Sequence, residues 1–153
     1  IVNGCTRLQP VVMLMGQALG AYAALGARDD RPPREVPIER VQTALLDAGC
    51  QLYIMYDVPT GHELFRPVQD LALAGILSAD DPTRLKPAEP IPGEWAARWA
   101  GRADVSAAVS APGDGPLRRD DVREPLAGHL ANIDGVVSRG AFVKALHATL
   151  SER

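Results

Sequence analysis

The longest uncharged stretch of the chain lies near its start and has the pattern of a buried helix. From Val11 to Ala27 every residue is apolar or small except Gln17 and Tyr22. Pro10 suits the first helical turn, where a missing N–H costs nothing, and Gly26 suits a C-terminal stop. The pattern therefore predicts a helix of about four turns between them. Because it is apolar almost all round, we expect it to be buried on most sides.

Two glycines inside this helix point to close packing. Gly16 and Gly20 lie four residues apart and hence on one face. Each glycine in a helix interior costs about 1 kcal/mol relative to alanine, a cost that close approach of another element usually offsets. We therefore expect something large to pack there. A membrane span needs about 20 consecutive apolar residues. This stretch is shorter and rich in glycine, so we interpret it as a core helix and predict no membrane span.

A second helical pattern follows directly. Pro37 is placed to open it and Gly49 follows it. Its acidic residues form no pair suited to catalysis and are interpreted as a solvated face. Its apolar positions recur at helical spacing and predict a buried stripe made of Ile38, Val41, Leu45 and Ala48.

The rest of the chain alternates short helical patterns with proline-rich breaks. After a short extended stretch over 53–59, a helix is predicted in which Pro67 must lie within the first turn, and Gly75 can end it in a left-handed conformation. A proline-rich loop over 85–92 leads to another helix, and Ser138 is a good N-cap for the last one. The apolar stripes of these helices contain Leu64, Phe65, Val68, Leu71 and Ala72, then Trp95 and Trp99, then Phe142, Leu146 and Leu150.

The opening segment carries a motif that resembles a known family. The motif runs through Asn3-Gly4, Arg7-Leu8-Gln9-Pro10, Gly16-Gln17-Ala18, Gly20 and Ala23-Ala24. It resembles the closing segment of the FAD-binding domain in FAD-dependent oxidoreductases, particularly the bacterial family labelled xanthan-lyase-like. The resemblance implies that the helix is the last one of an α/β flavin domain and that its N-terminus points at the flavin ring. A helix N-terminus carries about half a positive charge and free N–H groups.

The resemblance also implies a site, a cofactor and a partner. The residues implied to lie near FAD are Asn3, Gly4, Arg7, Gln9, Pro10 and Val11. The Gly-rich turn that holds the pyrophosphate in such domains does not occur in this sequence. The chain also opens on Ile1 rather than Met and shows no charged-then-apolar leader. We therefore expect a C-terminal fragment, inactive alone, whose partners are the rest of the FAD-binding domain and an unidentified small-molecule substrate.

The second half resembles a different family. A pattern similar to the S-layer-homology module is carried by Phe65, Val68, Leu71, Gly75, Ile76, Leu85, Pro87, Ile91, Glu94 and Trp95. The module's Thr-Arg pair is replaced by Pro92-Gly93, and a weaker second copy covers 117–130 and 133–146. The predicted fold is therefore mainly α. It consists of 1–49 as the end of a FAD-binding domain, 50–61 as a linker and 62–153 as an S-layer-homology-like helical region.

Composition removes several function classes. The 153 residues carry a net charge of -3, so the composition shows no excess of basic residues of the kind that binds nucleic acid. Cys5 and Cys50 form no metal-binding pattern with the three histidines, and Asp80-Asp81 and Asp120-Asp121 lack the order of a calcium loop, so no metal is predicted.

No catalytic residue is indicated either. His129 and His147 have no nucleophile placed for a triad, and both are interpreted as structural or exposed. Trp95 and Trp99 could stack on a sugar, but a pair on one helical face favours a core role.

Two function classes remain. The favoured one is the C-terminal part of a flavin-dependent oxidoreductase, which completes the flavin pocket through its first loop and helix. In the alternative, the chain is a non-catalytic, S-layer-homology-like module that binds cell-wall polysaccharide. The feature that separates them is the motif before the first helix, which a wall-binding module has no reason to carry.

Overall fold

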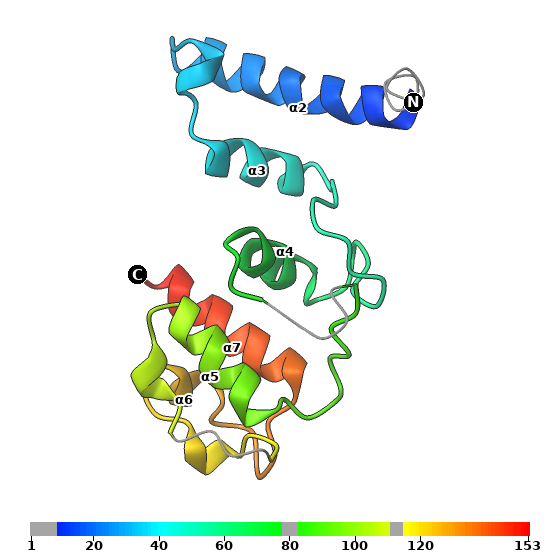
Figure 1. Cartoon of the computed structure of the whole chain (residues 1–153). Coiled ribbons are helices and arrows are strands. Elements are labelled where there is room, and N and C mark those ends of the chain that lie inside the picture. Colours follow the sequence, from blue (N-terminus) through cyan, green and yellow to red (C-terminus); the bar gives the residue numbers. More distant parts are fainter. Residues whose placement is uncertain (1–8, 78–82, 111–114) are drawn as a thin grey trace. The chain divides into compact units, whose positions relative to one another are not determined.

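The chain forms two compact helical units. The computed structural model describes residues 9–77, 83–110 and 115–153, and it divides the chain into Ile1–Leu52, the first unit, and Tyr53–Arg153, the second unit (Figure 1). Across the described ranges the regular structure is helical, joined by isolated β-bridges. The predicted mainly α class is confirmed. The identity of the two predicted domains stays a prediction.

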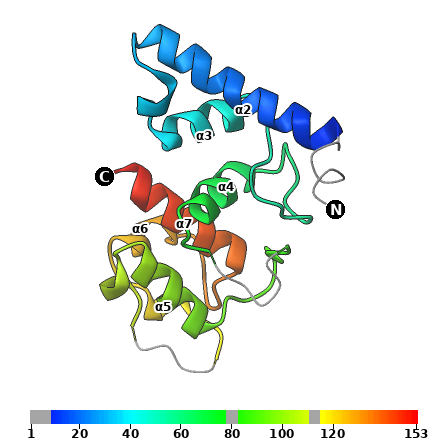
Figure 2. The same ribbon diagram turned by 45° about the horizontal axis from the view of Figure 1, so that its top comes forward.

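The first unit is a pair of helices of unequal length. Helix α2 spans Gln9–Arg28 and has 20 residues, the short 3-10 helix η1 spans Pro33–Glu35, and α3 spans Ile38–Asp47 with 10 residues. Figures 1 and 2 show α3 lying along the C-terminal half of α2, so that the N-terminal half of α2 extends beyond it. The core contains Leu25, Val36, Val41 and Leu45, with Ala21, Tyr22, Ala44, Cys50 and Leu52 packed around it.

Gly26 does not end α2 as predicted. The helix continues to Arg28, and the residue with positive φ after it is Asp30, at 51°. The amide of Arg31 then donates to the carbonyl of Gly26 at 2.8 Å, which closes the helix end. Gly26 serves another purpose, because a Cβ at this position would lie 2.7 Å from the carbonyl oxygen of Arg31. The glycine allows the chain to turn back tightly over the helix.

The second unit gathers its helices around α7. Helices α4 (Phe65–Leu73) and α6 (Leu126–His129) both contact α7 (Arg139–Ser151), while α5 (Gly93–Arg102) runs into the 3-10 helix η2 (Ser106–Ala108), and η3 spans Arg119–Asp121 (Figure 2). The centre is aromatic: the ring centroid of Trp99 lies 6.0 Å from that of Trp95 and 6.4 Å from that of Phe142. All three side chains are buried, so the core interpretation of the tryptophans is confirmed.

Three loop segments of the second unit join in a closed ring of backbone hydrogen bonds. Ile91 N–H donates to Val137 C=O at 3.0 Å, Val137 N–H to Leu117 C=O at 2.9 Å, and Leu117 N–H to Ile91 C=O at 2.9 Å. All three side chains are buried. The ring satisfies the backbone polar groups of three extended segments that form no sheet. From the sequence, Ile91 was predicted to lie in the proline-rich loop, Val137 directly precedes the predicted N-cap Ser138, and Leu117 begins the weaker repeat.

Local signals in this unit were reliable. Gly75 has a φ of +72° and follows Ala74, the C-cap of α4, and Pro67 lies in the first turn of that helix. The hydroxyl of Ser138 accepts the amide of Ala141 at 3.2 Å and caps α7 as predicted. These elements position the polar network described below.

Candidate functional site

The predicted flavin-facing residues lie at the leading end of α2. Asn3, Gly4 and Arg7 fall outside the described residues. Gln9 is the first residue of α2, followed by Pro10 and Val11, both of which are exposed. No acidic residue lies in the first turn, so nothing in that turn offsets the positive end of the helix dipole. The described part of the chain leaves this end of the helix open.

The expected burial of α2 on most sides is wrong for this chain. Met13 is 74% exposed, Leu14 64% and Leu19 65%, while Leu25 near the other end is 9% exposed. The physical reason is length: α3 is half as long as α2 and covers only its C-terminal half. The helix is nevertheless anchored rather than loose, because Tyr22 and Leu25 pack on the core of the first unit.

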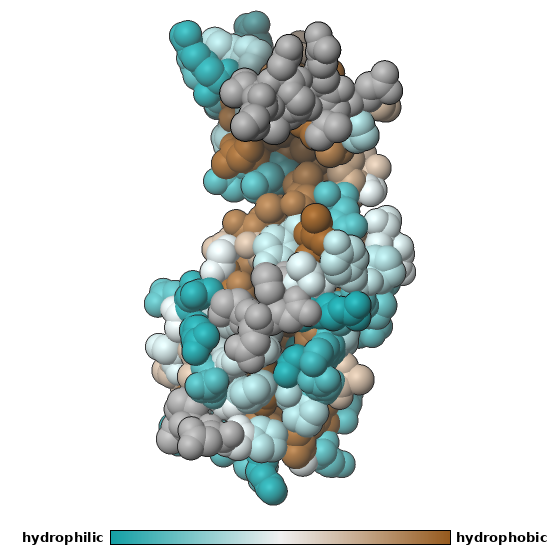
Figure 3. Space-filling view, turned by 45° about the vertical axis from the view of Figure 1, so that its right-hand side comes forward, coloured by the Kyte–Doolittle hydropathy of each residue, from teal (hydrophilic) through white to brown (hydrophobic). Residues whose placement is uncertain are grey.

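The face that carries the two glycines is also open. A Cβ at Gly16 or at Gly20 would meet no atom within 4 Å. The large element expected on this face is therefore not supplied by the described residues. Figure 3 shows brown apolar side chains on the surface of the first unit beside teal polar ones. This uncharged surface of α2, made of Val12, Met13, Met15, Gly16, Leu19 and Gly20, is called the open face below.

The same helix is long and apolar enough to cross a membrane by length and composition alone. The segment Pro10–Arg28 has a mean hydropathy of 1.4, and 11% of the window is buried. A core helix of a soluble protein, which is mostly buried, and a signal sequence near an N-terminus can have the same length and composition. The absence of a membrane span therefore stays a prediction.

A hollow lies where α2 extends beyond α3. It has a volume of about 480 Å³, and its walls include Leu14 and Ala18 of α2 and Gly49 after α3. The side-chain amide of Gln17 donates to the sulfur of Cys50 at 2.9 Å across it. This contact ties the middle of α2 to the chain that leaves α3, and it gives Gln17, part of the sequence motif, a structural partner.

Charge is confined to the other end of α2. The carboxylate of Asp29 accepts a hydrogen bond from Arg40 of α3 and pairs with Arg28 at 3.4 Å. The hydrogen bond from Arg40 is the main cause that lowers the pKa of Asp29 below its usual 3.8. The charges of α2 thus lie at its C-terminal end, and the part of the helix that projects beyond α3 carries none.

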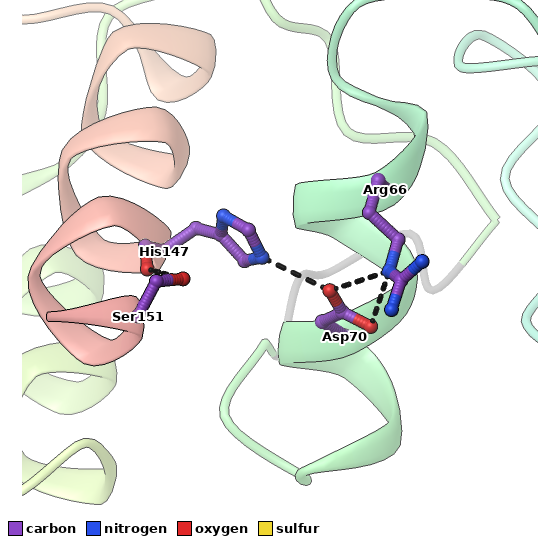
Figure 4. A network of polar contacts seen from close by, with 4 residues as sticks. All are labelled: Arg66, Asp70, His147 and Ser151. Atoms are coloured by element: carbon purple, nitrogen blue, oxygen red, sulfur yellow. Dashed lines mark hydrogen bonds and ion pairs between the residues drawn. The ribbon is translucent and has the colours of Figure 1, made fainter. Parts of the chain in front are cut away.

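The second unit contains a polar network that joins α4 to α7. Asp70 accepts hydrogen bonds from the Nε of Arg66 at 3.0 and 2.8 Å, and its Oδ2 lies 2.9 Å from the Nε2 of His147 (Figure 4). Beside it, Lys144 of α7 lies 2.7 Å from Glu63 and by this hydrogen bond lowers the pKa of that carboxyl. All of these side chains are partly exposed, and the network fastens one helix to the other.

The nearby serine does not make this network a catalytic triad. The hydroxyl of Ser151 donates to the backbone carbonyl of His147 at 2.9 Å, as Figure 4 shows, and not to the imidazole. In a triad the base takes its proton from the nucleophile. His147 therefore has a structural role here, in line with the interpretation from sequence. Among the described residues, no group of three or more histidine, cysteine or carboxylate side chains could hold a metal.

Sequence reasoning missed two features. The contact between Asp70 and His147 joins residues 77 positions apart, and no local pattern signals such a pair. The stripe predicted for α3 is correct for Val41 and Leu45 and wrong for its ends, because Ile38 is 47% exposed and Ala48 is exposed too. The periodicity identified an apolar face but not whether this chain covers all of it.

Comparison with known proteins gives one family. Residues 1–45 match the family described as FAD dependent oxidoreductase. This match covers α2, η1 and most of α3, and it supports a part of a FAD-dependent oxidoreductase at the start of the chain. Neither curated proteins nor solved structures gave a match. The xanthan-lyase-like subfamily and the S-layer-homology resemblance of 62–153 stay predictions.

Proposed function

We propose that residues 1–45 are the closing part of the FAD-binding domain of a FAD-dependent oxidoreductase, whose remaining part packs on the open face of α2 and whose flavin lies at the leading end of that helix. The proposal rests on the family match over residues 1–45, which include α2, because the apolar side chains of this helix are largely exposed. A helix without charge from Gln9 to Ala27 is a core helix in need of a partner.

The leading end of α2 fits a flavin ring on physical grounds. Pro10 and Val11 are exposed there, and the first turn holds no carboxylate that would repel a negative ring. When bound, FAD supplies the hydride or electron transfer. We expect this chain to hold the ring with the segment that contains Gly4 and Arg7, and to direct the amides of the first turn of α2 toward negative charge on the ring. Charge near a helix terminus is stabilised by about 0.3–1 kcal/mol when exposed and more when partly buried.

The packing of α3 favours a protein partner over a bilayer on the open face. α3 lies along α2 and carries Glu39, Arg40 and Asp47. If α2 crossed a membrane, these charges would be drawn toward the hydrocarbon, where one charged side chain at the centre costs about 2.5–3.5 kcal/mol on insertion scales. A folded domain avoids this cost because it covers only the open face.

The first test concerns the reading frame upstream of Ile1. We expect a strand followed by a Gly-rich phosphate-binding turn, and its absence from the gene would sink the proposal. The chain by itself should purify without flavin, since the turn that holds the pyrophosphate is not in its sequence. Stoichiometric FAD on this chain alone would show that the pocket is elsewhere.

The second test concerns Arg7 in the full-length flavoprotein. Arg7→Ala should lower flavin affinity and shift the redox potential, because a cation near the ring favours its anionic reduced form. Arg98→Ala is the matched control, since Arg98 is exposed in the second unit and lies on neither proposed contact surface. Equal flavin affinity and potential in both variants would refute the role of Arg7.

The alternative, a polysaccharide-binding module in 62–153, stays a prediction from the sequence. Its test is binding of the second unit to purified cell-wall polysaccharide.

A further inference from the structure

An apolar groove opens beside the open face, on the side of η1. Its volume is about 670 Å³. Helix α2 contributes Leu19, Tyr22 and Ala23, and the turn into α3 contributes Pro33, Val36 and Ile38. Arg34 also lines the groove, but its side chain is 84% exposed and pairs with Glu35 at 3.9 Å. The floor is closed, because Val36 is only 5% exposed.

The groove and the open face form one surface. Leu19, 65% exposed, belongs to both, and Ile38 extends the apolar area onto the first residue of α3 with 47% exposure. Ile38 is also the first residue of the apolar stripe of α3, and the described residues leave it exposed. Large contiguous apolar surfaces are uncommon on soluble monomers and mark contact sites.

We infer that the preceding part of the same FAD-binding domain inserts large apolar side chains into this groove, so that its contact runs from the open face of α2 across η1 to Ile38. This inference rests on the proposed function and adds the extent and chemistry of the contact. The family match supports the choice of occupant, because it continues to residue 45 and so includes both walls of the groove rather than α2 alone.

The open face and the groove fit different kinds of partner side chains. The open face is flattened at Gly16 and Gly20, where a Cβ would meet nothing within 4 Å, so it accepts a bulky or closely approaching element. The groove is concave and accepts projecting leucine, phenylalanine or methionine side chains. A charged side chain inserted there would lose its hydration with only the exposed Arg34 pair nearby.

Hydroxyl-radical footprinting read by mass spectrometry tests the inference. The full-length flavoprotein is compared with the present chain, and an added reporter peptide normalises the radical dose. Met13 and Met15 report the open face, while Tyr22 and Ile38 report the groove. If Ile38 falls from 47% exposure to the 9% of Leu25, its oxidation slows about fivefold.

The outcomes separate the two proposals. Protection of Met13 and Met15 together with Tyr22 and Ile38 supports both the proposed function and the groove contact. Protection of the two methionines alone overturns the groove contact and leaves the proposed function standing. No protection at either pair overturns both.

Two further measurements address other occupants. Protection of Tyr22 and Ile38 that rises with the concentration of the isolated chain would identify a second copy as the occupant, and protection by neutral phosphatidylcholine vesicles would identify a lipid surface. Either result overturns the inference. With the expected partner, Ile38→Asp should weaken flavin retention in the full-length protein, and Ile38→Val should not.

Discussion

Replacement of Gly16 by alanine should stabilise the first unit when this chain is studied alone. Glycine costs about 0.8–1.0 kcal/mol relative to alanine in a helix interior. The added Cβ at Gly16 would meet no atom within 4 Å, so no clash offsets the gain. The expected change is therefore about 1 kcal/mol in favour of the folded state. If the proposed partner packs on the open face in the full-length protein, the gain should vanish there, because the partner then occupies that space.

Gly26→Ala is the matched control in the same helix. There the Cβ would lie 2.7 Å from the carbonyl oxygen of Arg31, and the amide of Arg31 is already fixed by its hydrogen bond to Gly26. Overpacking costs about 1–3 kcal/mol. After the gain in helix propensity, the net result is a loss of up to about 2 kcal/mol. The two alanines should thus have opposite effects in one helix.

Native-state hydrogen exchange of the α2 amides is the suitable assay. A gain of about 1 kcal/mol slows exchange through unfolding of the unit about fivefold. Both tryptophans lie in the second unit, so their fluorescence in urea shows whether that unit is unaffected. Faster exchange in Gly16→Ala than in the parent chain would refute the reasoning, since it would mean that this face is already covered in the isolated chain.

Other substitutions probe the second unit and the acidic range. Gly140→Ala should cost up to about 2 kcal/mol, net of its gain in helix propensity, in urea unfolding followed by tryptophan fluorescence, since its Cβ would lie 3.1 Å from the Pro87 carbonyl oxygen that the Gly140 amide holds by a hydrogen bond, whereas Gly101→Ala, with nothing within 4 Å, should not destabilise. Phe142→Ala removes a fully buried ring and should cost about 3–5 kcal/mol in the same assay; a cost below that of Gly140→Ala would contradict its central place. The pKa of Asp29 is lowered, chiefly by the hydrogen bond from Arg40, so this contact stabilises the fold fully above the usual pKa of 3.8. The stabilisation is lost as the pH falls below 3.8 and through the lowered pKa. Asp29→Asn should therefore flatten the acid dependence of α2 exchange, and an unchanged profile would count against the ion pair.

Local chemistry in the sequence determined most of the elements. Pro10 and Pro37 opened helices, Gly75 ended one with positive φ, and Ser138 capped the last. Each of these effects acts within one or two turns of backbone, so it can be read from a few neighbouring residues. The motif over residues 3–24 indicated a FAD-dependent oxidoreductase, and the family match over 1–45 supports that origin.

Only the tertiary structure decided which apolar surfaces are covered. Periodicity gave α2 and α3 apolar faces, but coverage depends on the length of the neighbouring helix, which is why Met13 and Ile38 are exposed while Leu25 is not. The same holds for Asp70 and His147, and for the ring through Ile91, Leu117 and Val137. These contacts join residues far apart in the chain, and their energies depend on packing that no local pattern encodes.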